Sequence, residues 1–304
     1  MLKKVLVLGG SYFVGRVFNI LASRSNEFEI VVVNRGTYEL KLDNVSQVHI
    51  DRHSGAMIRG IVPADTFDTI IDFCAYEPGD IAGFTSSMLC KTKQYIYIST
   101  SSVYDPYAPT PVAETAKEAD FFGEDENGVY VAKKLKLEAE LKEAARNCGF
   151  SWTIFRPSFI YGPFNYAPRE PMYFQNLLKG MPIPHPTDAT ARFNMVYVKD
   201  VARMVMAACA NERAYNEVIN LAGPDELSYD SFLAALEKNW GKKIETRPVT
   251  CAQAAAEQIP LPFPLQFDEL YDGKKAERLL GEHYTPFDEA FAETYRIYMK
   301  AMGG

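Results

Sequence analysis

A glycine-rich turn directly after the first apolar run is the feature that most constrains how this chain folds. The run Val5–Leu8 leads into Gly9–Gly15, and a helical pattern follows over Val14–Ser25. Glycines allow a strand to turn sharply into a helix whose free N–H groups can face a pyrophosphate, and Gly15 allows that helix to pack closely on the sheet. An ordinary tight turn would show the same glycines, but the position before a helix and a second strand ending near Val33 favours a dinucleotide turn.

A phosphate-binding P-loop is excluded, although the spacing Gly10-x-x-x-x-Gly15 fits one. Arg16 and Val17 stand where that loop needs a lysine followed by serine or threonine. The lysine that grips the phosphate and the hydroxyl that binds Mg²⁺ are therefore both missing.

Apolar runs alternate with helical patterns through the first half of the chain. Strands that are apolar almost throughout and are separated by helices indicate a parallel sheet covered on both faces. The sequence therefore predicts an α/β fold, a doubly wound Rossmann-type parallel sheet. The predicted strands are Lys4–Leu8, Ile30–Val33, Gln47–Ile50, Thr69–Phe73, Tyr95–Ser99 and Trp152–Phe155, and the predicted helices are Val14–Ser25, Ile81–Leu89 and Tyr130–Asn147.

The second half of the chain has a different character. Proline and aromatic residues crowd 163–186, and a strand with a following helix returns at Asn194–Ala210, before a further strand at Glu217–Leu221. Ligands of such a fold bind at the carboxyl ends of the strands, between the sheet and its neighbour. We expect a dinucleotide-binding sheet domain from residues 1–163 plus 194–222 and a smaller, mainly C-terminal substrate lobe from residues 164–193 plus 223–304.

Charge and composition exclude several classes of protein. The 304 residues carry a net charge of −7, which counts against nucleic acid as the main partner because an acidic chain repels phosphate backbones. The apolar runs are far shorter than the ~18 residues of a membrane span, and no export signal precedes the first strand, so we expect a cytoplasmic protein without a membrane partner. The five scattered cysteines form no Cys-x-x-Cys pair, and the four histidines form no cluster with them, which predicts reduced thiols and no metal site.

Tyr130 and Lys134 are the candidate acid–base pair. Residues four apart lie one above the other on a helix, so both side chains can address the same point. A free tyrosine, with a pKa near ~10, is a poor base at neutral pH, and a nearby ammonium group lowers that pKa. The same pairing occurs by chance in many helices, but Thr100 adds a hydroxyl at the same sheet edge, directly after the strand Tyr95–Ser99.

Motifs along nearly the whole chain resemble the extended short-chain dehydrogenases/reductases, the group of nucleotide-sugar epimerases and dehydratases. Tyr12 stands where the middle glycine of that family's turn usually is, which narrows the approach to the pyrophosphate. A substituted middle position is typical of an atypical branch that includes chloroplast stem-loop RNA-binding proteins. The segments that carry the resemblance are Gly9–Gly15, Thr100–Tyr104, Tyr130–Lys134, Arg156–Pro163, Val196–Ala202, Tyr215–Gly223, Tyr271–Ala276 and Leu280-Gly281.

The resemblance implies a hydride-transfer enzyme with an NAD(P) cofactor. Thr100 would orient the substrate oxygen, Tyr130 would exchange its proton, and Lys134 would hold the cofactor ribose and keep Tyr130 acidic. Expected substrate contacts are Ser101, Ser102 and Arg192, unless Arg192 forms only a salt bridge at the rim. The residues that match cofactor contacts of the family are Gly9, Gly10, Ser11, Tyr12, Phe13, Val14, Gly15, Asn34, Arg35, Asp51, Arg52, Cys74, Ala75, Tyr76, Ser99, Pro157 and Phe159.

The residues after the second strand favour NADP, with NAD as the other option. NAD-specific relatives end this strand with an aspartate that repels a 2′-phosphate, whereas this chain has Asn34 and Arg35. Asn34 can still bond a hydroxyl, and the Arg35 guanidinium can pair with a phosphate. If Arg35 points into solvent or stacks on adenine, both cofactors would bind comparably. Asp51 and Arg52 fit either a contact to the adenine edge or a surface ion pair.

We expect an epimerase or reductase that acts on a nucleotide-sugar or a related polyhydroxy compound. The family's 4,6-dehydratases carry an acidic pair directly after the catalytic threonine, and Ser101 and Ser102 stand there instead, which excludes that subclass. The alternative is a regulatory or RNA-binding protein on the same fold with reduced chemistry, because one fold hosts many functions.

Relatives pair two helices across a two-fold axis, so the resemblance also predicts a homodimer. The helices would be Ile81–Leu89 and Tyr130–Asn147. The residues that would extend their shared face, or else lie in the core, are Phe84, Met88, Leu137 and Leu141.

Overall fold

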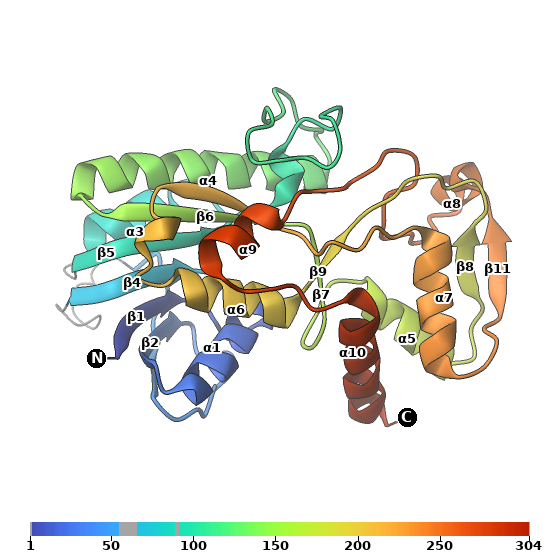
Figure 1. Ribbon diagram of the computed structural model, residues 1–304, viewed down its shortest axis with the longest axis horizontal. Helices are drawn as coiled ribbons and strands as arrows, with labels where there is room; N and C mark the ends of the chain where they lie inside the picture. Colours follow the sequence, from blue (N-terminus) through green and yellow to red (C-terminus); the bar gives the residue numbers. More distant parts are fainter. Residues whose placement is uncertain (1, 55–65, 89–90, 304) are drawn as a thin grey trace.

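Seven parallel strands form the centre of the molecule, which a computed structural model describes for residues 2–54, 66–88 and 91–303 (Figure 1). The strands follow the order β10-β6-β5-β4-β1-β2-β3, and each neighbouring pair in this sheet is parallel. The chain starts in the middle, adds β2 and β3 on one side, and then builds the other side, so the predicted doubly wound fold is confirmed. The strands are β1 (Lys3–Leu8), β2 (Phe28–Asn34), β3 (Val45–His49), β4 (Thr66–Asp72), β5 (Lys91–Ile98), β6 (Ser151–Pro157) and β10 (Glu217–Leu221).

The first strand shows why the predicted strands have no polar face. Val5 and Val7 belong to one hydrophobic core, and Leu6 and Leu8 belong to a second core. All four side chains are buried because alternate residues of a strand point to opposite faces of the sheet. Burial on both faces is what a parallel sheet between two helical layers requires.

Helices cover both faces of the sheet. α1 (Phe13–Ser25) packs beside α6 (Val198–Ala208), while α3 (Asp80–Ser87) packs beside α4 (Glu126–Cys148). The first pair shares the core of Val5, and the second pair lies over the opposite face. Within the described parts of the chain, no helix is long and apolar enough to cross a membrane.

The residues considered for a dimer face lie in the core of the protomer. Phe84, Leu137 and Leu141 are fully buried beneath α3 and α4, and Met88 packs against the same core. They cover the sheet, so they are unavailable to a second copy. Leu89, at the end of the predicted helix, lies outside the described residues.

The start of α4 differs from the prediction. The helix begins at Glu126, because the carboxylate of Asp125 accepts a hydrogen bond from the Gly128 N–H at 3.0 Å and caps the first turn. Tyr130 therefore lies in the second turn and does not open the helix.

The strand near Asn194 is a second correction. β9 (Met195–Tyr197) does not join the main sheet but pairs with β7 (Phe159–Tyr161) in a separate two-stranded sheet. The chain leaves the main sheet after β6, and the backbone groups of β7 form hydrogen bonds with those of β9. The late part of the chain therefore reaches the main sheet only through β10.

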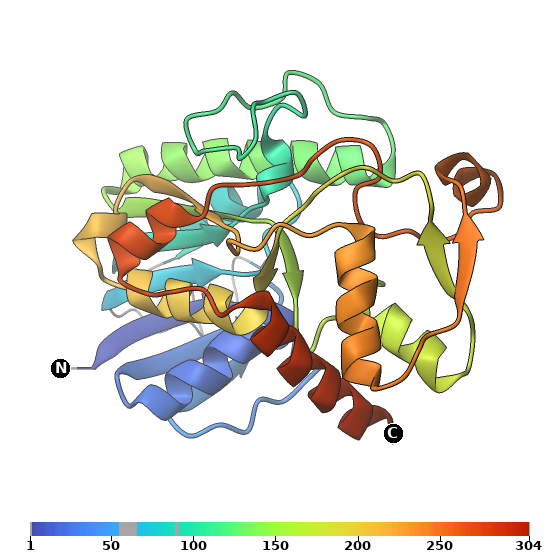
Figure 2. The same ribbon diagram turned by 45° about the vertical axis from the view of Figure 1, so that its right-hand side comes forward.

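The remaining elements form a second group beside the sheet (Figures 1 and 2). Stacked and edge-on rings around Phe263 hold this group together, and Phe193 stacks on it with ring centres 4.7 Å apart. α9 (Lys274–Leu280) lies apart from the group and packs against β10 and α6. The elements of the group are α5 (Glu170–Leu178), β8 (Ile183–Pro186), α7 (Tyr229–Trp240), β11 (Thr246–Val249), α8 (Cys251–Ala256) and α10 (Phe287–Met302).

Candidate active site

A cavity of about 1190 Å³ lies at the carboxyl ends of β1, β2, β4 and β5. Pockets that hold drug-sized ligands have volumes of roughly 300–1000 Å³. The volume of this cavity therefore suits a dinucleotide together with a substrate. The loops 104–125 and 267–271 border one end of it, and residues 33–37 and 50–53 border the other. We call the second end, lined by Asn34, Arg35, Asp51, Arg52 and Cys74, the adenosine end.

The glycine-rich turn has the close packing that the sequence predicts. Gly9 and Gly10 have φ values of 87° and 76°, in the left-handed region that favours glycine. A Cβ atom on Gly15 would lie 2.6 Å from the Cα of Gly10, so the first turn of α1 packs directly on the turn. The Asn19 amide donates to the Gly10 carbonyl at 2.8 Å and fixes this arrangement. The turn thus forms a narrow cradle that only glycine fits.

Tyr12 brings an aromatic side chain to this cradle. It lies directly before α1 and lines the cavity, and its ring contacts Tyr38 edge-on with centres 4.8 Å apart. Tyr166, from the opposite side of the cavity, lies 6.4 Å from Tyr12 and 6.1 Å from Phe13. Phe13 has a φ of 30°, which is unusual for a residue with a side chain. The substitution of the middle glycine therefore places a ring beside the expected pyrophosphate.

Thr100, Tyr130 and Lys134 all line the cavity. Thr100 caps a short 3₁₀ turn, where its hydroxyl accepts a hydrogen bond from the Ser102 N–H at 3.2 Å. The Lys134 ammonium is buried and donates to the carbonyl oxygens of Ala75 at 3.2 Å and Ile98 at 2.9 Å. Its Nζ lies 5.7 Å from the centre of the Tyr130 ring.

Burial sets the proton affinities of this pair. It lowers the pKa of Lys134 to about 8 and raises the pKa of Tyr130 to about 12, with Tyr166 adding to the latter and Arg169 opposing it. In the protein by itself, the expected lowering of the Tyr130 pKa by Lys134 is therefore not found. Desolvation of the phenolate is the largest contribution to that pKa.

Two glutamates of α4 bind groups outside the helix rather than the lysines four residues before them. Glu138 is buried and receives two hydrogen bonds from Arg156, at 3.0 and 2.6 Å. Glu140 accepts the Gly79 N–H at 2.6 Å. Because Glu138 binds Arg156 of β6, Lys134 donates its hydrogen bonds to the carbonyl oxygens instead.

At the adenosine end, Asn34 and Arg35 have different roles. Asn34 is buried, donates to the Gly9 carbonyl at 3.1 Å, and accepts from the Gly36 N–H at 2.8 Å and the Gln47 amide at 3.0 Å. Its side chain therefore holds the turn together. Arg35 is exposed and lines the cavity.

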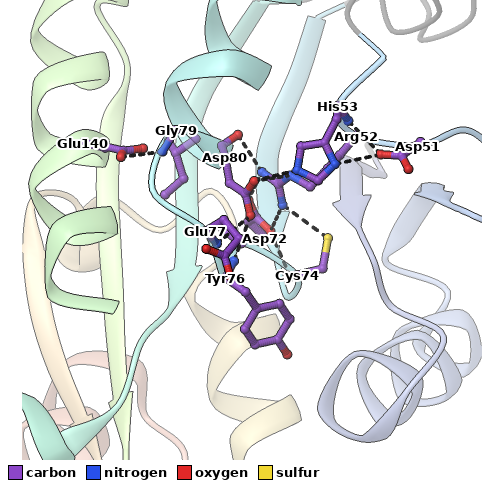
Figure 3. Close-up of polar contacts among 12 residues, drawn as sticks. Asp51, Arg52, His53, Asp72, Cys74, Tyr76, Glu77, Gly79, Asp80 and Glu140 are labelled. Atoms are coloured by element: carbon purple, nitrogen blue, oxygen red, sulfur yellow. Dashed lines mark hydrogen bonds and ion pairs between the residues drawn. The ribbon is translucent and has the colours of Figure 1, made fainter. Parts of the chain in front are cut away.

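Arg52 forms a buried ion pair with Asp72 rather than a surface pair (Figure 3). Its two terminal nitrogens each donate to a different oxygen of Asp72 at 2.9 Å, and the Cys74 sulfur lies 3.3 Å away. The Tyr95 hydroxyl donates to the same carboxylate at 2.7 Å. Arg52, despite burial, holds the pKa of Asp72 below its ordinary value. The pair fixes the ends of β3 and β4 to each other.

Three predicted site residues do not line the cavity. Ala75 is buried and contributes only its carbonyl oxygen to Lys134. Ser101 is buried beneath the 3₁₀ turn. Arg192 donates to Asp268 at 2.8 Å and to Glu226 at 2.7 Å, so the rim salt bridge is what the structure contains. The cavity therefore lacks the phosphate contact that we expected from Arg192.

Several cavity residues carry no sequence signal that we could use. Arg169 donates one hydrogen bond, to the Ile160 carbonyl at 3.3 Å, and burial lowers its pKa. Glu269 has a pKa raised by burial. Ser99 and Ser158 line the cavity with buried hydroxyls that have no hydrogen-bond partner among the described residues. Such hydroxyls are free to bind a ligand.

Comparison with known proteins identifies the family. Residues 5–222 match the NAD dependent epimerase/dehydratase family. The chain belongs to this family. It is 27% identical over 252 residues to the chloroplast stem-loop binding protein of 41 kDa b of Arabidopsis thaliana, covering 79% of this chain and 64% of that relative, so the match spans less than two thirds of the relative's length.

Two further comparisons concern enzymes of similar size. The chain is 24% identical over 285 residues to 2'-dehydrokanamycin reductase of Streptomyces kanamyceticus, covering 91% of this chain and 78% of that enzyme. Its fold is similar to that of UDP-glucuronic acid 4-epimerase of Bacillus cereus in complex with NAD, with a TM-score of 0.78, 18% identity, and coverage of 99% and 100%.

Membership of the NAD dependent epimerase/dehydratase family implies a nicotinamide dinucleotide as the cofactor. The residues of the cavity fit that cofactor. The absence of a Cβ at Gly9, Gly10 and Gly15 lets the turn pack tightly, and the turn lines the cavity at the N-terminus of α1, where a pyrophosphate would bind. The partnerless hydroxyls of Ser99 and Ser158 lie in the same cavity.

Proposed function

We propose that this protein is an epimerase or reductase that transfers hydride between NADP and a hydroxyl-bearing carbon of a nucleotide-sugar or a related polyhydroxy compound. The observation that carries the proposal is that Thr100, Tyr130 and the buried Lys134 line the same cavity as the glycine cradle. The bound nicotinamide supplies the hydride acceptor or donor. The chain supplies the proton transfer and the orientation.

Tyr130 exchanges the proton of the reacting hydroxyl, and Thr100 holds the oxygen. Lys134 carries most of its charge at neutral pH, because its pKa is about 8. An ammonium group held by two carbonyl oxygens keeps its position and stabilises negative charge that develops on the Tyr130 oxygen. Ser102 lines the cavity beside Thr100 and would contact the substrate.

The preference for NADP rests on Asn34 and Arg35. The Asn34 amide is neutral and binds Gly9, Gly36 and Gln47, so it brings no negative charge to the adenosine end. Arg35 lines the cavity and can form a charge-assisted contact to a 2′-phosphate, which contributes on the order of 1.5–3 kcal/mol.

The RNA-binding alternative has one supporting observation, the similarity to a protein named for stem-loop binding. The net charge of −7 counts against it. A gel-shift titration with structured RNA at physiological salt distinguishes the two functions, because the enzyme that we propose gives no shift.

The substrate class is tested by incubating the protein with NADP and UDP-glucose or UDP-glucuronate. We expect a new sugar epimer, or a change in nicotinamide absorbance if the protein is a reductase. If no nucleotide-sugar is converted and a free polyhydroxy compound is, the substrate is a polyhydroxy compound and not a nucleotide-sugar.

Three finer proposals complete this account. We propose that the sheet domain and substrate lobe divide as the sequence suggests, except that α9 packs against β10 and α6 and that β9 lies outside the main sheet. We also propose that a homodimer forms through the outer faces of α3 and α4, which a sedimentation mass would test. We also propose a cytoplasmic location, where thiols stay reduced. The described cysteines Cys74, Cys148, Cys209 and Cys251 are all free.

A further inference from the structure

His53 bridges two elements at the adenosine end of the cavity. Its ring Nδ1 lies 2.9 Å from an oxygen of Asp51, and its ring Nε2 lies 2.8 Å from an oxygen of Asp80 (Figure 3). Asp51 follows β3, whereas Asp80 belongs to the first turn of α3. All three residues line the cavity together with Arg35.

The geometry requires two donors on the His53 ring. Both ring nitrogens face carboxylate oxygens, and only the imidazolium has an N–H on each nitrogen, whereas neutral imidazole has one. The hydrogen bond to Asp80, and then that to Asp51, raises the pKa of His53 above its ordinary value. The ring is therefore charged further into the neutral pH range than a free histidine.

The two carboxylates differ in what else holds them. Asp80 is buried and accepts the N–H groups of Tyr76 at 2.9 Å and Glu77 at 3.0 Å, and the Arg52 guanidinium approaches it at 4.0 Å. Asp51 is half exposed, and the hydrogen bonds that it receives come from the His53 backbone and ring. Asp51 is thus the carboxylate that depends on His53.

Among the described residues, the other charges around His53 are paired or attractive to phosphate. Asp72 is bound by Arg52, and Glu77 is bound by Lys133 at 2.7 Å. Arg35 is close enough to Asp51 that, together with His53, it lowers the pKa of that carboxyl. A 2′-phosphate that binds Arg35 would therefore meet the charge of Asp51.

We propose that His53 is a second determinant of dinucleotide choice beside Arg35, because its charged ring neutralises Asp51 and admits the 2′-phosphate of NADP. The inference rests on the NADP preference proposed above. When the ring loses one proton, a single N–H remains for the two carboxylates, and this N–H stays hydrogen-bonded to the buried Asp80. Asp51 then repels the phosphate. NADP affinity falls as pH rises, whereas NAD affinity does not.

Fluorescence titrations with NADPH and NADH, from about pH 7 to about pH 9, test the inference. The 2′-phosphate is already doubly charged over this range, since its second pKa is about 6. We expect the affinity for NADPH relative to NADH to fall about threefold to fivefold in the unmodified protein, the size of an exposed ion pair. The ratio removes any effect that both dinucleotides share.

Two variants should abolish this pH dependence, one with a low and one with a high ratio of NADPH affinity to NADH affinity. His53→Gln cannot neutralise Asp51, so its ratio should be constant and low. Asp51→Asn lacks the repelling charge, so its ratio should be constant and high. His283→Gln, at an exposed histidine that pairs with Glu277 away from the cavity, should behave like the unmodified protein.

The outcomes separate this inference from the cofactor proposal. NADPH preference that does not change with pH, or that changes equally in His53→Gln, would overturn the role of His53 and leave that of Arg35. Preference for NADH at every pH would overturn the NADP proposal, and this inference with it. Circular dichroism would verify that each variant is folded.

Discussion

The Nζ atom of Lys134 lies 5.7 Å from the centre of the Tyr130 ring, on the next turn of α4. Burial brings the two pKa values to about 8 for the lysine and about 12 for the tyrosine. At neutral pH the ammonium is charged and the phenol is protonated. The pair therefore starts as a proton donor, and removal of a substrate proton requires further positive charge near the phenolate, such as that of an oxidised nicotinamide.

Tyr130→Phe should reduce turnover by about 10²–10⁴-fold, the usual contribution of a positioned acid–base group. The ring remains, so dinucleotide affinity should be nearly unchanged. Tyr107→Phe, at an exposed tyrosine outside the cavity lining, is the matched control. Steady-state rates and cofactor titrations on both variants provide the measurement, and substantial activity in Tyr130→Phe would rule out the relay.

Lys134→Met should weaken both turnover and dinucleotide binding, and it should alter how stability depends on pH. The pKa of Lys134 is about 8 in the folded protein, below its ordinary value of 10.5, so the unfolded chain holds more protons between these values. The free energy of unfolding of the unmodified protein should therefore rise by roughly 2 kcal/mol, relative to that of the variant, between about pH 7 and about pH 10. Urea unfolding at both pH values measures this difference, and equal pH profiles would contradict the burial of a charged lysine.

The sequence could predict the sheet because its signals are local. Continuous apolar strands such as Ile30–Val33 and the turn at Gly9–Gly15 predict a doubly wound parallel sheet without reference to distant residues. The position of β9 could not be predicted, because its short run suits a main-sheet strand equally well. Only the departure of β7 from the sheet, a long-range event, makes it pair elsewhere.

Gly15→Ala should abolish dinucleotide binding and destabilise the protein. The added methyl group would lie 2.6 Å from the Gly10 Cα, a backbone atom that cannot move aside without distorting the turn. Gly83→Ala in α3 is the control, since its methyl group meets nothing within 4 Å and removes a helical glycine, for a gain of about 0.5–1 kcal/mol. Thermal unfolding and cofactor titration of both variants test this. Normal binding by Gly15→Ala would mean that the cradle does not hold the pyrophosphate.

Arg35→Ala should lower NADP affinity about tenfold to a hundredfold and leave NAD affinity nearly unchanged, because only NADP carries the 2′-phosphate. Arg146→Ala, at an exposed position in the last turn of α4, controls for the loss of one positive charge. Calorimetric titration with both dinucleotides is the measurement. Tighter binding of NAD by the unmodified protein, or an equal loss for both cofactors, would refute the assignment.

The sequence predicts the site residues that belong to motifs. It does not predict those whose contacts depend on how distant elements pack. Thr100, Tyr130 and Lys134 carry the family pattern and meet in one cavity. Arg192 belongs to none of these motifs, and Asp268 lies close enough in the fold to hold it at the rim. His53 and Arg169 have no pattern, because their partners come from α3 and from β7.

Native mass spectrometry of the protein mixed with NADP tests the central claim most directly, namely that the glycine cradle and Tyr130 belong to one dinucleotide site. The account predicts one dinucleotide per chain in the unmodified protein and in Tyr130→Phe, and none in Gly15→Ala. Absence of the dinucleotide from the unmodified protein, or its full retention by Gly15→Ala, would contradict the account.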